Sequence, residues 1–418
     1  MIRAITLGLP LFDRPITELG TQVQVFSQAS TARVTEKGWP IRTTRFCLPP
    51  LGADFETSAN RIPSIVQSVA RLAEANGVRW FCLPVDLTDG GPSEARRTAL
   101  LETLLRENRL FTNLMVSDGG DISVQGAADA AHFILSVSRK SRKGYDNFRV
   151  GASCGCLPNT PFFPFSRHAS SSPGFSVALE TAEIALKLAK AVHGGSMTLE
   201  DFRAQFTAEL SDRLLEMDAF ATALSTETGV AYAGLDASLA PFPDGETSVG
   251  RLLELLGADP FGAHGTVFLT ALLTDCIKTA ITKSQVRTTG FNGVMYSVLE
   301  DDILARATRR RSINIASLNL LSTMCGCGLD MVPVPGDLLV DDITGIIMDT
   351  ATLATRLNKP LGVRILPIPD RTINEYTEFN MEFLCDARVL NVSGPDTSLS
   401  FDQDRWSFMH PNPSGTPS

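Results

Sequence analysis

Two segments of this chain contain the residue types that could carry out chemistry. The first is a loop rich in proline and phenylalanine that contains His168 and is followed by Glu180. A neutral imidazole and a carboxylate can act as general base and general acid, and both are common ligands of divalent metal ions. We therefore predict catalytic roles for His168 and Glu180, either directly or as metal ligands. The alternative is a structural loop whose histidine is hydrogen-bonded to the backbone.

The second segment is the glycine-rich stretch from Cys325 to Asp330. Its small residues let backbone amides approach a ligand closely and cradle an anion, so Gly326 and Gly328 are predicted to bind substrate. Cys325 and Cys327 could supply a nucleophile, a metal ligand or a redox pair, and two buried apolar thiols are the competing interpretation. Asp330 is predicted to act in catalysis or to bind a cation.

These residues leave the identity of any cofactor open. If a divalent metal ion binds, its predicted ligands are His168, Glu180 and Asp330. If Cys325 is instead a nucleophile, it needs a nearby base that lowers its pKa, and His168 or His264 could serve.

Three further residues are predicted to bind substrate. Arg149 lies in a predicted strand, and His264 lies in a glycine-flanked loop that leads into a helix. Asp337 follows the glycine-rich segment and precedes a predicted helix. The competing interpretations are a simple turn at His264 and a helix N-cap at Asp337.

The elements that must position these residues alternate along the chain. Short β-branched or aromatic runs are followed by longer stretches of helical periodicity, which is typical of parallel sheets with crossover helices. The predicted strands cover residues 2–7, 21–26, 41–47, 78–84, 111–116, 147–153, 230–235, 293–299, 361–368 and 387–392. Among the predicted helices is one over residues 176–192. A closed barrel is favoured over an open sheet, because the chain lacks both the G-x-G-x-x-G and the G-x-x-x-x-G-K-[ST] nucleotide-binding motifs. In such folds the active site forms where strands end, in the loops that follow them.

Composition excludes several classes of protein. The 418 residues carry a net charge of −9 without a basic stripe, which argues against binding to nucleic acid or to an anionic membrane. No apolar run approaches the roughly 18 residues of a membrane-spanning helix. The eight cysteines form no dense disulfide framework, so reduced thiols in the cytoplasm are expected. We predict one α/β domain over residues 1–396 and a loose tail, rich in Ser, Pro, Asp and Asn, over residues 397–418.

Several segments together resemble the DUF711 family, also called UPF0210. They are residues 147–153, 161–168, 175–180, 250–254 with 261–262, 273–278, 293 with 299–301, 325–337 and 357–361. The most specific is the block Cys-Gly-x-Gly-Leu-Asp-x-Val-Pro-x-Pro-Gly-Asp at residues 325–337, and the resemblance extends to about residue 392. It implies a ten-stranded α/β barrel similar to that of pyruvate formate-lyase and ribonucleotide reductase. It also implies a cytosolic homodimer whose gene often neighbours that of a small ACT-domain protein. Cys327 stands where relatives are expected to have a hydroxyl residue.

The implied barrel suggests radical chemistry, but its sequence signals are missing. A glycyl radical enzyme needs R-V-x-G-[YF] on a C-terminal loop, whereas here Arg388-Val389 continues as Leu390-Asn391 and Gly394 comes too late. A ribonucleotide reductase would also need a C-terminal cysteine pair, and the last cysteine is Cys385. We therefore reject radical catalysis, since a fold does not imply a function.

Two functions remain. The first is an enzyme of hydrolase or lyase type, acting on a small polar or carboxylate metabolite at the barrel mouth by acid/base or metal-assisted chemistry. The second is a metabolite-binding regulatory protein that works with an ACT-type partner. A sensor of this kind would keep the anion cradle but would lack a matched acid and base.

Overall fold

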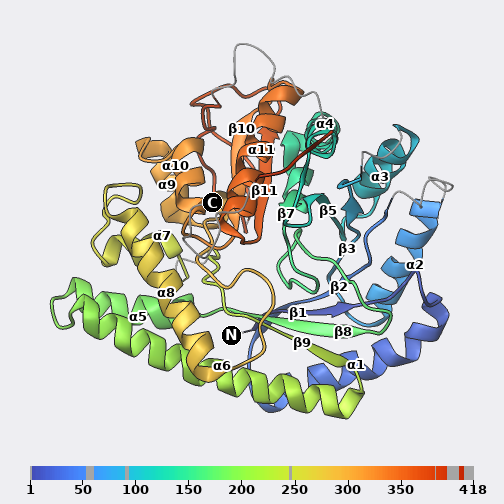
Figure 1. Cartoon of the computed structure of the whole chain (residues 1–418), viewed down its shortest axis with the longest axis horizontal. Coiled ribbons are helices and arrows are strands. Elements are labelled where there is room, and N and C mark those ends of the chain that lie inside the picture. The colour runs from blue at the N-terminus through green and yellow to red at the C-terminus, as the bar shows by residue number, and fades with distance from the viewer. Residues whose placement is uncertain are drawn as a thin grey trace, which may run out of the picture.

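The computed structural model is a mixed α/β fold built around a ten-stranded, mostly parallel sheet (Figure 1). It describes residues 2–52, 61–89, 94–243, 247–381, 383–392 and 404–408. The strands of the large sheet are β1 (Ile2–Gly8), β2 (Ile41–Cys47), β3 (Trp80–Cys82), β4 (Val85–Asp86), β5 (Leu110–Ser117), β7 (Val150–Cys154), β8 (Gly174–Leu179), β9 (Ala231–Asp236), β10 (Gly328–Pro335) and β11 (Leu361–Ile368). Most of these strands are buried along their whole length, which explains their nearly continuous apolar sequences.

The strand order divides the sheet into one central block and two flanking pairs. The order is β10-β11-β7-β5-β3-β2-β1-β8-β9, and β4 pairs with β5 outside this path. Neighbouring strands are parallel except at β11–β7 and at β1–β8, where they are antiparallel. The five strands β1, β2, β3, β5 and β7 therefore run in one direction, and the pairs β8–β9 and β10–β11 run in the other.

The segment that leads to the 3-10 turn η3 (Val298–Glu300) touches both outer strands of this order. Single parallel bridges join it to the β9 side at Leu235–Thr288 and Leu239–Val294. Another parallel bridge joins Ser297 to Asp330 of β10. A strand was predicted over residues 293–299, and the structure has these isolated bridges there instead.

Helices surround the sheet. They are α1 (Ile16–Glu36), α2 (Arg61–Ala75), α3 (Glu94–Arg106), α4 (Val124–Lys140), α5 (Ala182–His193), α6 (Leu199–Thr228), α7 (Val249–Leu255), α8 (Thr266–Ser284), α9 (Asp302–Arg310), α10 (Ile315–Ser322) and α11 (Val340–Leu357), with a 3-10 helix η2 (Arg142–Arg149). In Figure 1, α1 and α6 run below β1, β8 and β9, and α4 and α11 lie beside β7 and β11. Within the described chain, no helix combines the length and the apolar character needed to cross a membrane.

Three further predicted elements differ from the structure. Residues 21–26 belong to α1, whose buried Leu19, Val23 and Phe26 follow helical spacing. Residues 176–192 were expected to form one helix, but they contain the end of β8 followed by α5. Residues 387–392 form no strand, and Arg388 makes only an isolated bridge with Tyr376.

Most of the predicted tail, residues 397–418, lies outside the described residues, as does Gly394. Within residues 404–408, β12 (Arg405–Trp406) pairs with β6 (Ile122–Ser123) in a separate two-stranded sheet.

The loop between β7 and β8, residues 155–173, folds back onto the sheet through Phe165. The ring of this buried phenylalanine packs on two glycines of adjacent strands, Gly151 of β7 and Gly362 of β11. A Cβ atom at Gly362 would lie 2.4–2.7 Å from three ring atoms, and one at Gly151 would lie 2.5 Å from the ring. The two glycines therefore provide the space that lets this loop approach the sheet.

We expect Gly362→Ala to lower the free energy of unfolding by about 1–3 kcal/mol, because the added methyl group overpacks the site of Phe165. Thermal unfolding followed by circular dichroism measures the effect. Gly345→Ala on α11 is the matched control, because its Cβ would meet nothing within 4 Å. Equal melting temperatures for the two variants would contradict this packing.

Candidate active site

A cavity of about 560 Å³ opens between the central strands and the β10–β11 pair. Its walls come from β1, β2, β3, β5, β10 and β11, from the loop between β7 and β8, and from the segment before η3. This volume is typical of pockets that bind a small metabolite. The lining contains many arginines and aromatic rings, together with Cys327, Ser297, Glu300 and Asp330.

Two arginines of the wall formed by β1 and β2 share one buried carboxylate, that of Glu180. Arg3 donates from Nη1 to Glu180 Oε1 at 2.9 Å, and Arg42 donates from Nε to both carboxylate oxygens at 2.8 Å. The Glu180 side chain is only 1% exposed and sits between β8 and α5, behind the two arginines. Glu180 was predicted to be catalytic or metal-binding, and its observed contacts are those of a residue that holds Arg3 and Arg42 in place.

Arg45 of β2 differs from these two arginines because its buried charge has no carboxylate partner in the described part of the chain. It is 6% exposed, and it donates from Nε to Thr43 Oγ1 at 2.9 Å and from Nη1 to the Pro161 carbonyl at 3.0 Å. Its guanidinium lies 5.0 Å from the ring centre of Phe163 and 5.3 Å from that of Trp80. Burial, and then the nearby charge of Arg3, lower the pKa of Arg45 to about 9. An anion in the cavity would relieve this unfavourable charge.

The wall formed by β10, β11 and η3, opposite the first, carries the acidic groups Asp330 and Glu300. Arg364 binds Asp330 in a bidentate pair, with Nε–Oδ1 at 2.6 Å and Nη2–Oδ2 at 2.9 Å. Glu300 accepts a hydrogen bond from Ser297 Oγ at 2.6 Å and one from Arg364 Nη2 at 3.3 Å. Burial raises the pKa of Asp330 despite the opposing effect of Arg364. Asp330 was predicted as a site residue, and the structure gives it a place on the cavity wall.

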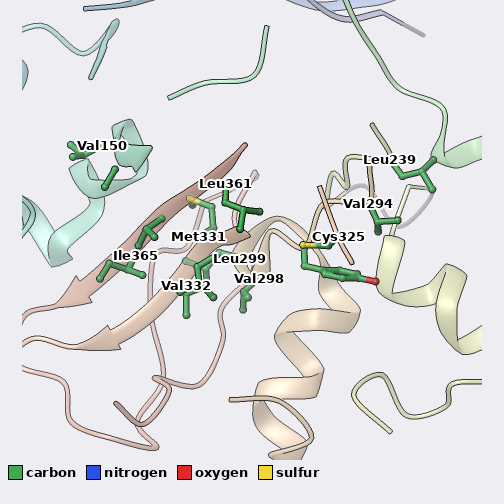
Figure 2. Close-up of a cluster of buried hydrophobic side chains, with 14 of the residues drawn as sticks. Val150, Leu239, Val294, Val298, Leu299, Cys325, Met331, Val332, Leu361 and Ile365 are labelled. Atoms are coloured by element: carbon green, nitrogen blue, oxygen red, sulfur yellow. The ribbon is translucent and has the colours of Figure 1, made fainter. Parts of the chain in front are cut away.

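The two cysteines before β10 interact with each other. Cys327 lines the cavity, whereas Cys325 lies behind it in the main core, where Figure 2 shows it among buried hydrophobic side chains. A hydrogen bond from the Cys327 thiol lowers the pKa of Cys325 to about 6. The charge of Lys359 and the backbone amides of Gly328 and Cys327 act in the same direction, and burial opposes them. The same coupling, together with burial, raises the pKa of Cys327. These effects favour a thiolate on Cys325, with the proton held on Cys327.

The glycine-rich segment was predicted to cradle a substrate anion, and its amides have partners within the protein. The Gly326 N–H donates to the Val294 carbonyl at 2.6 Å. The amides of Cys327 and Gly328 point at the sulfur of Cys325. Lys359 Nζ donates to the carbonyls of Ser322, at 2.9 Å, and of Cys325, which fixes this turn beside β11.

His168 lies outside the cavity lining. Its ring is fully buried against Gly8, with Nδ1 3.1 Å from Asn159 Oδ1 and Nε2 3.1 Å from the Ser172 carbonyl. Burial lowers the pKa of His168. Both ring nitrogens already have protein partners, which agrees with the structural alternative considered for this loop.

The remaining predicted residues also lie away from the cavity. Arg149 is buried and donates from Nη1 to the carbonyls of Leu104, Glu107 and Leu110 at 2.8–3.0 Å, where it satisfies the end of α3 and the turn that follows. His264 is exposed in the turn before α8, and Asp337 is exposed before α11. The backbone N–H at the N-cap position of α11, Leu339, is bonded by Asp342 and not by Asp337.

The predicted metal ligands do not meet. His168, Glu180 and Asp330 each contact different groups, as described above. Among the residues that the structure describes, no three His, Cys, Asp or Glu side chains are grouped so that they could hold a metal ion. The arrangement of these residues therefore does not fit a shared divalent ion.

Five arginines that line the cavity were missed by the sequence analysis: Arg3, Arg42, Arg45, Arg79 and Arg364. Arg3 and Arg364 are charged residues within largely apolar strands, and Arg42 and Arg45 flank two threonines in β2. A buried strand tolerates a cation only when it is paired or when it serves a ligand, so this pattern was the available signal.

Comparison with known proteins gives consistent matches over most of the chain. A family model described as "Uncharacterised ACR (DUF711)" matches residues 1–382. A UPF0210 protein of Pyrobaculum arsenaticum is 29% identical over 79% of this chain and 72% of its own length. A UPF0210 protein of Ligilactobacillus salivarius is 24% identical over 90% of this chain and 88% of its own length. One of Clostridium beijerinckii is 25% identical over 95% of this chain and 92% of its own length.

Proposed function

The chain belongs to the DUF711 family of UPF0210 proteins, and from its cavity we propose that it is an enzyme of hydrolase or lyase type acting on a small carboxylate metabolite. The observation that carries this proposal is the buried guanidinium of Arg45, which has no carboxylate partner among the described residues and faces the cavity. Arginine is well suited to bind a carboxylate through two parallel hydrogen bonds. The opposite wall supplies groups that could act on the bound molecule.

Cys327 and Asp330 are the proposed reactive groups. The Cys327 sulfur would attack an electrophilic carbon of the substrate, and the Cys325 thiolate would accept the proton of the Cys327 thiol as the carbon–sulfur bond forms. The leaving group would take the proton held by Cys325, and Asp330, a carboxylate whose pKa is raised by burial, would then accept a proton from the water that hydrolyses the bond to the Cys327 sulfur. This proton would return to the Cys327 sulfur, which restores the starting pair. In this scheme the cysteine pair supplies its own base, so neither His168 nor His264 is needed.

We also propose that the ten strands close into a barrel of the pyruvate formate-lyase type around this cavity. Support comes from the segment before η3, which bridges to the β9 side and to β10. A crystal structure with backbone hydrogen bonds running from β9 through this segment to β10 would test the closure. A cytoplasmic homodimer remains part of the proposal. All eight cysteines are free thiols, which suits a reducing compartment, and sedimentation analysis would measure the assembly.

The experiment is to incubate the purified protein with a mixture of carboxylate metabolites and to follow their consumption by mass spectrometry. We expect the wild-type protein and the control Cys385→Ala to consume the same compound. Cys327→Ala and Asp330→Asn are each expected to slow this consumption by about 100-fold or more.

Two outcomes would overturn the proposal. Undiminished turnover in Cys327→Ala would remove the thiol from the chemistry. Tight binding of a metabolite without turnover would instead favour the regulatory function with an ACT-type partner, because a sensor needs the arginines but no reactive pair.

A further inference from the structure

The cavity has an apolar side that is separate from the main core. Six of its lining residues belong to a small hydrophobic cluster of their own: Phe162, Phe165, Ala240, Phe291, Met295 and Cys327. All six are at most 8% exposed, and the rings of Phe165 and Phe291 meet edge to face with centroids 5.9 Å apart. A free volume bordered by such side chains favours an apolar group over a hydrated polar one.

Arg45 lies next to this apolar side. The carbonyl that accepts its Nη1 hydrogen bond belongs to Pro161, the residue before Phe162, and Phe163 provides a ring face to the same guanidinium. The cationic site and the apolar cluster are thus joined by three consecutive residues of one loop. A ligand that contacts both sides must carry its charge at one end.

The charges of the walls indicate how many negative charges the ligand has. Arg3, Arg42, Arg45 and Arg364 are opposed by three carboxylates, those of Glu180, Glu300 and Asp330. Arg79 also lines the cavity, but it is exposed and lies over the ring of Trp80, so water screens its charge. Apart from this exposed arginine, the walls hold one positive charge in excess. Inside the cavity, away from the exposed Arg79, a second negative charge on the ligand would have to lie against the phenylalanines or beside Glu300 and Asp330, and both places disfavour it.

From these observations we infer that the substrate is an amphipathic monocarboxylate, with its carboxylate on Arg45 and an aryl or branched alkyl body on the apolar cluster. This inference rests on the proposed function and narrows it from any small carboxylate to one class. Because Cys327 belongs to the apolar cluster, the carbon that it attacks lies in the body of the molecule and not in the carboxylate bound by Arg45.

The test is calorimetric binding of three probes to the full-length protein: 3-phenylpropionate, 3-phenyl-1-propanol and succinate. The first has the charge and the apolar body, the second lacks the charge, and the third has two carboxylates and no apolar body. We expect 3-phenylpropionate to bind at least tenfold more tightly than either of the others. Arg45→Met should weaken its binding at least tenfold, and Phe291→Ala should weaken it severalfold. Arg203→Met, at an exposed position of α6, is the control that leaves the affinity unchanged.

The outcomes separate this inference from the proposed function. Succinate binding as tightly as 3-phenylpropionate, with both weakened by Arg45→Met, would overturn the amphipathic ligand while the anion site stands. Equal affinities of wild-type protein and Arg45→Met for every carboxylate would overturn the anion site itself, and with it the proposed function. Because Arg45→Met removes a buried hydrogen-bonded group, Arg45→Lys serves as a second variant. It keeps the charge and is expected to retain part of the affinity.

Discussion

Arg364→Met is expected to lower the free energy of unfolding by about 3–5 kcal/mol near neutral pH. The side chains of Arg364 and Asp330 are 7% and 8% exposed, and the pair is bidentate. Removing the cation leaves a buried carboxylate without its partner, and the desolvation of that carboxylate is then uncompensated. Glu300 also loses one hydrogen-bond donor. Urea-induced unfolding followed by tryptophan fluorescence measures the change.

The loss of stability should depend on pH in a defined direction. Burial already holds the pKa of Asp330 above its ordinary value of 3.8, and loss of Arg364 removes the main opposing effect and raises it further. A carboxyl group whose pKa is higher in the folded than in the unfolded protein contributes most favourably to stability at a pH below its unfolded-state pKa. This contribution to stability is lost as the pH rises through the pKa of the folded state. The deficit of Arg364→Met relative to wild type should therefore be smallest at about pH 4 and grow toward neutral pH.

Two variants control this prediction. Arg203→Met breaks an exposed pair with Asp275, whose side chains are 57% and 52% exposed, and should cost less than about 1 kcal/mol. Arg364→Met combined with Asp330→Leu removes both charges of the buried pair and should regain most of the lost stability. If Arg364→Met alone lowers the free energy of unfolding no more than Arg203→Met does, the buried Asp330 carboxylate does not need Arg364 as its partner.

The sequence allowed the class of fold to be predicted, because helical and strand periodicities alternate so regularly. It failed where a local pattern was ambiguous. Val23 and Val25 alternate with glutamines as in a strand, yet they lie in α1, where Val25 is 46% exposed and only Val23 faces the core. β10 was missed because it contains Pro333, Pro335 and an aspartate, although it pairs in parallel with β11.

The site was harder to predict than the fold. Asp330 and the cysteine pair stand in a conspicuous glycine-rich segment, and both reach or adjoin the cavity. Arg45 gave no comparable signal, because its environment is made by the Pro161 carbonyl, 116 residues away in the sequence. His168 attracted attention as a rare residue type in a loop, yet burial and two local hydrogen bonds occupy it. Such long-range contacts cannot be derived from spacing along one chain.

The cysteine pair should ionise far more readily than an ordinary thiol, and this should depend on both sulfurs. With the pKa of Cys325 at about 6, roughly nine in ten pairs should carry a negative charge at about pH 7. Cys327→Ala removes the hydrogen bond that most lowers the pKa of Cys325, and burial, which raises this pKa, then becomes the largest effect. The charged fraction near pH 7 should fall to about one in a hundred or less. Thiolate absorbance in the ultraviolet, titrated against pH, measures this fraction directly.

Lys359→Met tests the smaller contribution of the nearby charge. Its effect on the pKa of Cys325 should be in the same direction as that of Cys327→Ala but weaker, because the thiol hydrogen bond is the larger cause. Cys276→Ala removes a buried thiol of α8 and should leave the titration unchanged. A wild-type midpoint at about 8.5 or above would mean that the two sulfurs do not share a proton. The Cys327 thiol would then lose the base that the proposed mechanism assigns to it, and neither His168 nor His264 lines the cavity to replace that base.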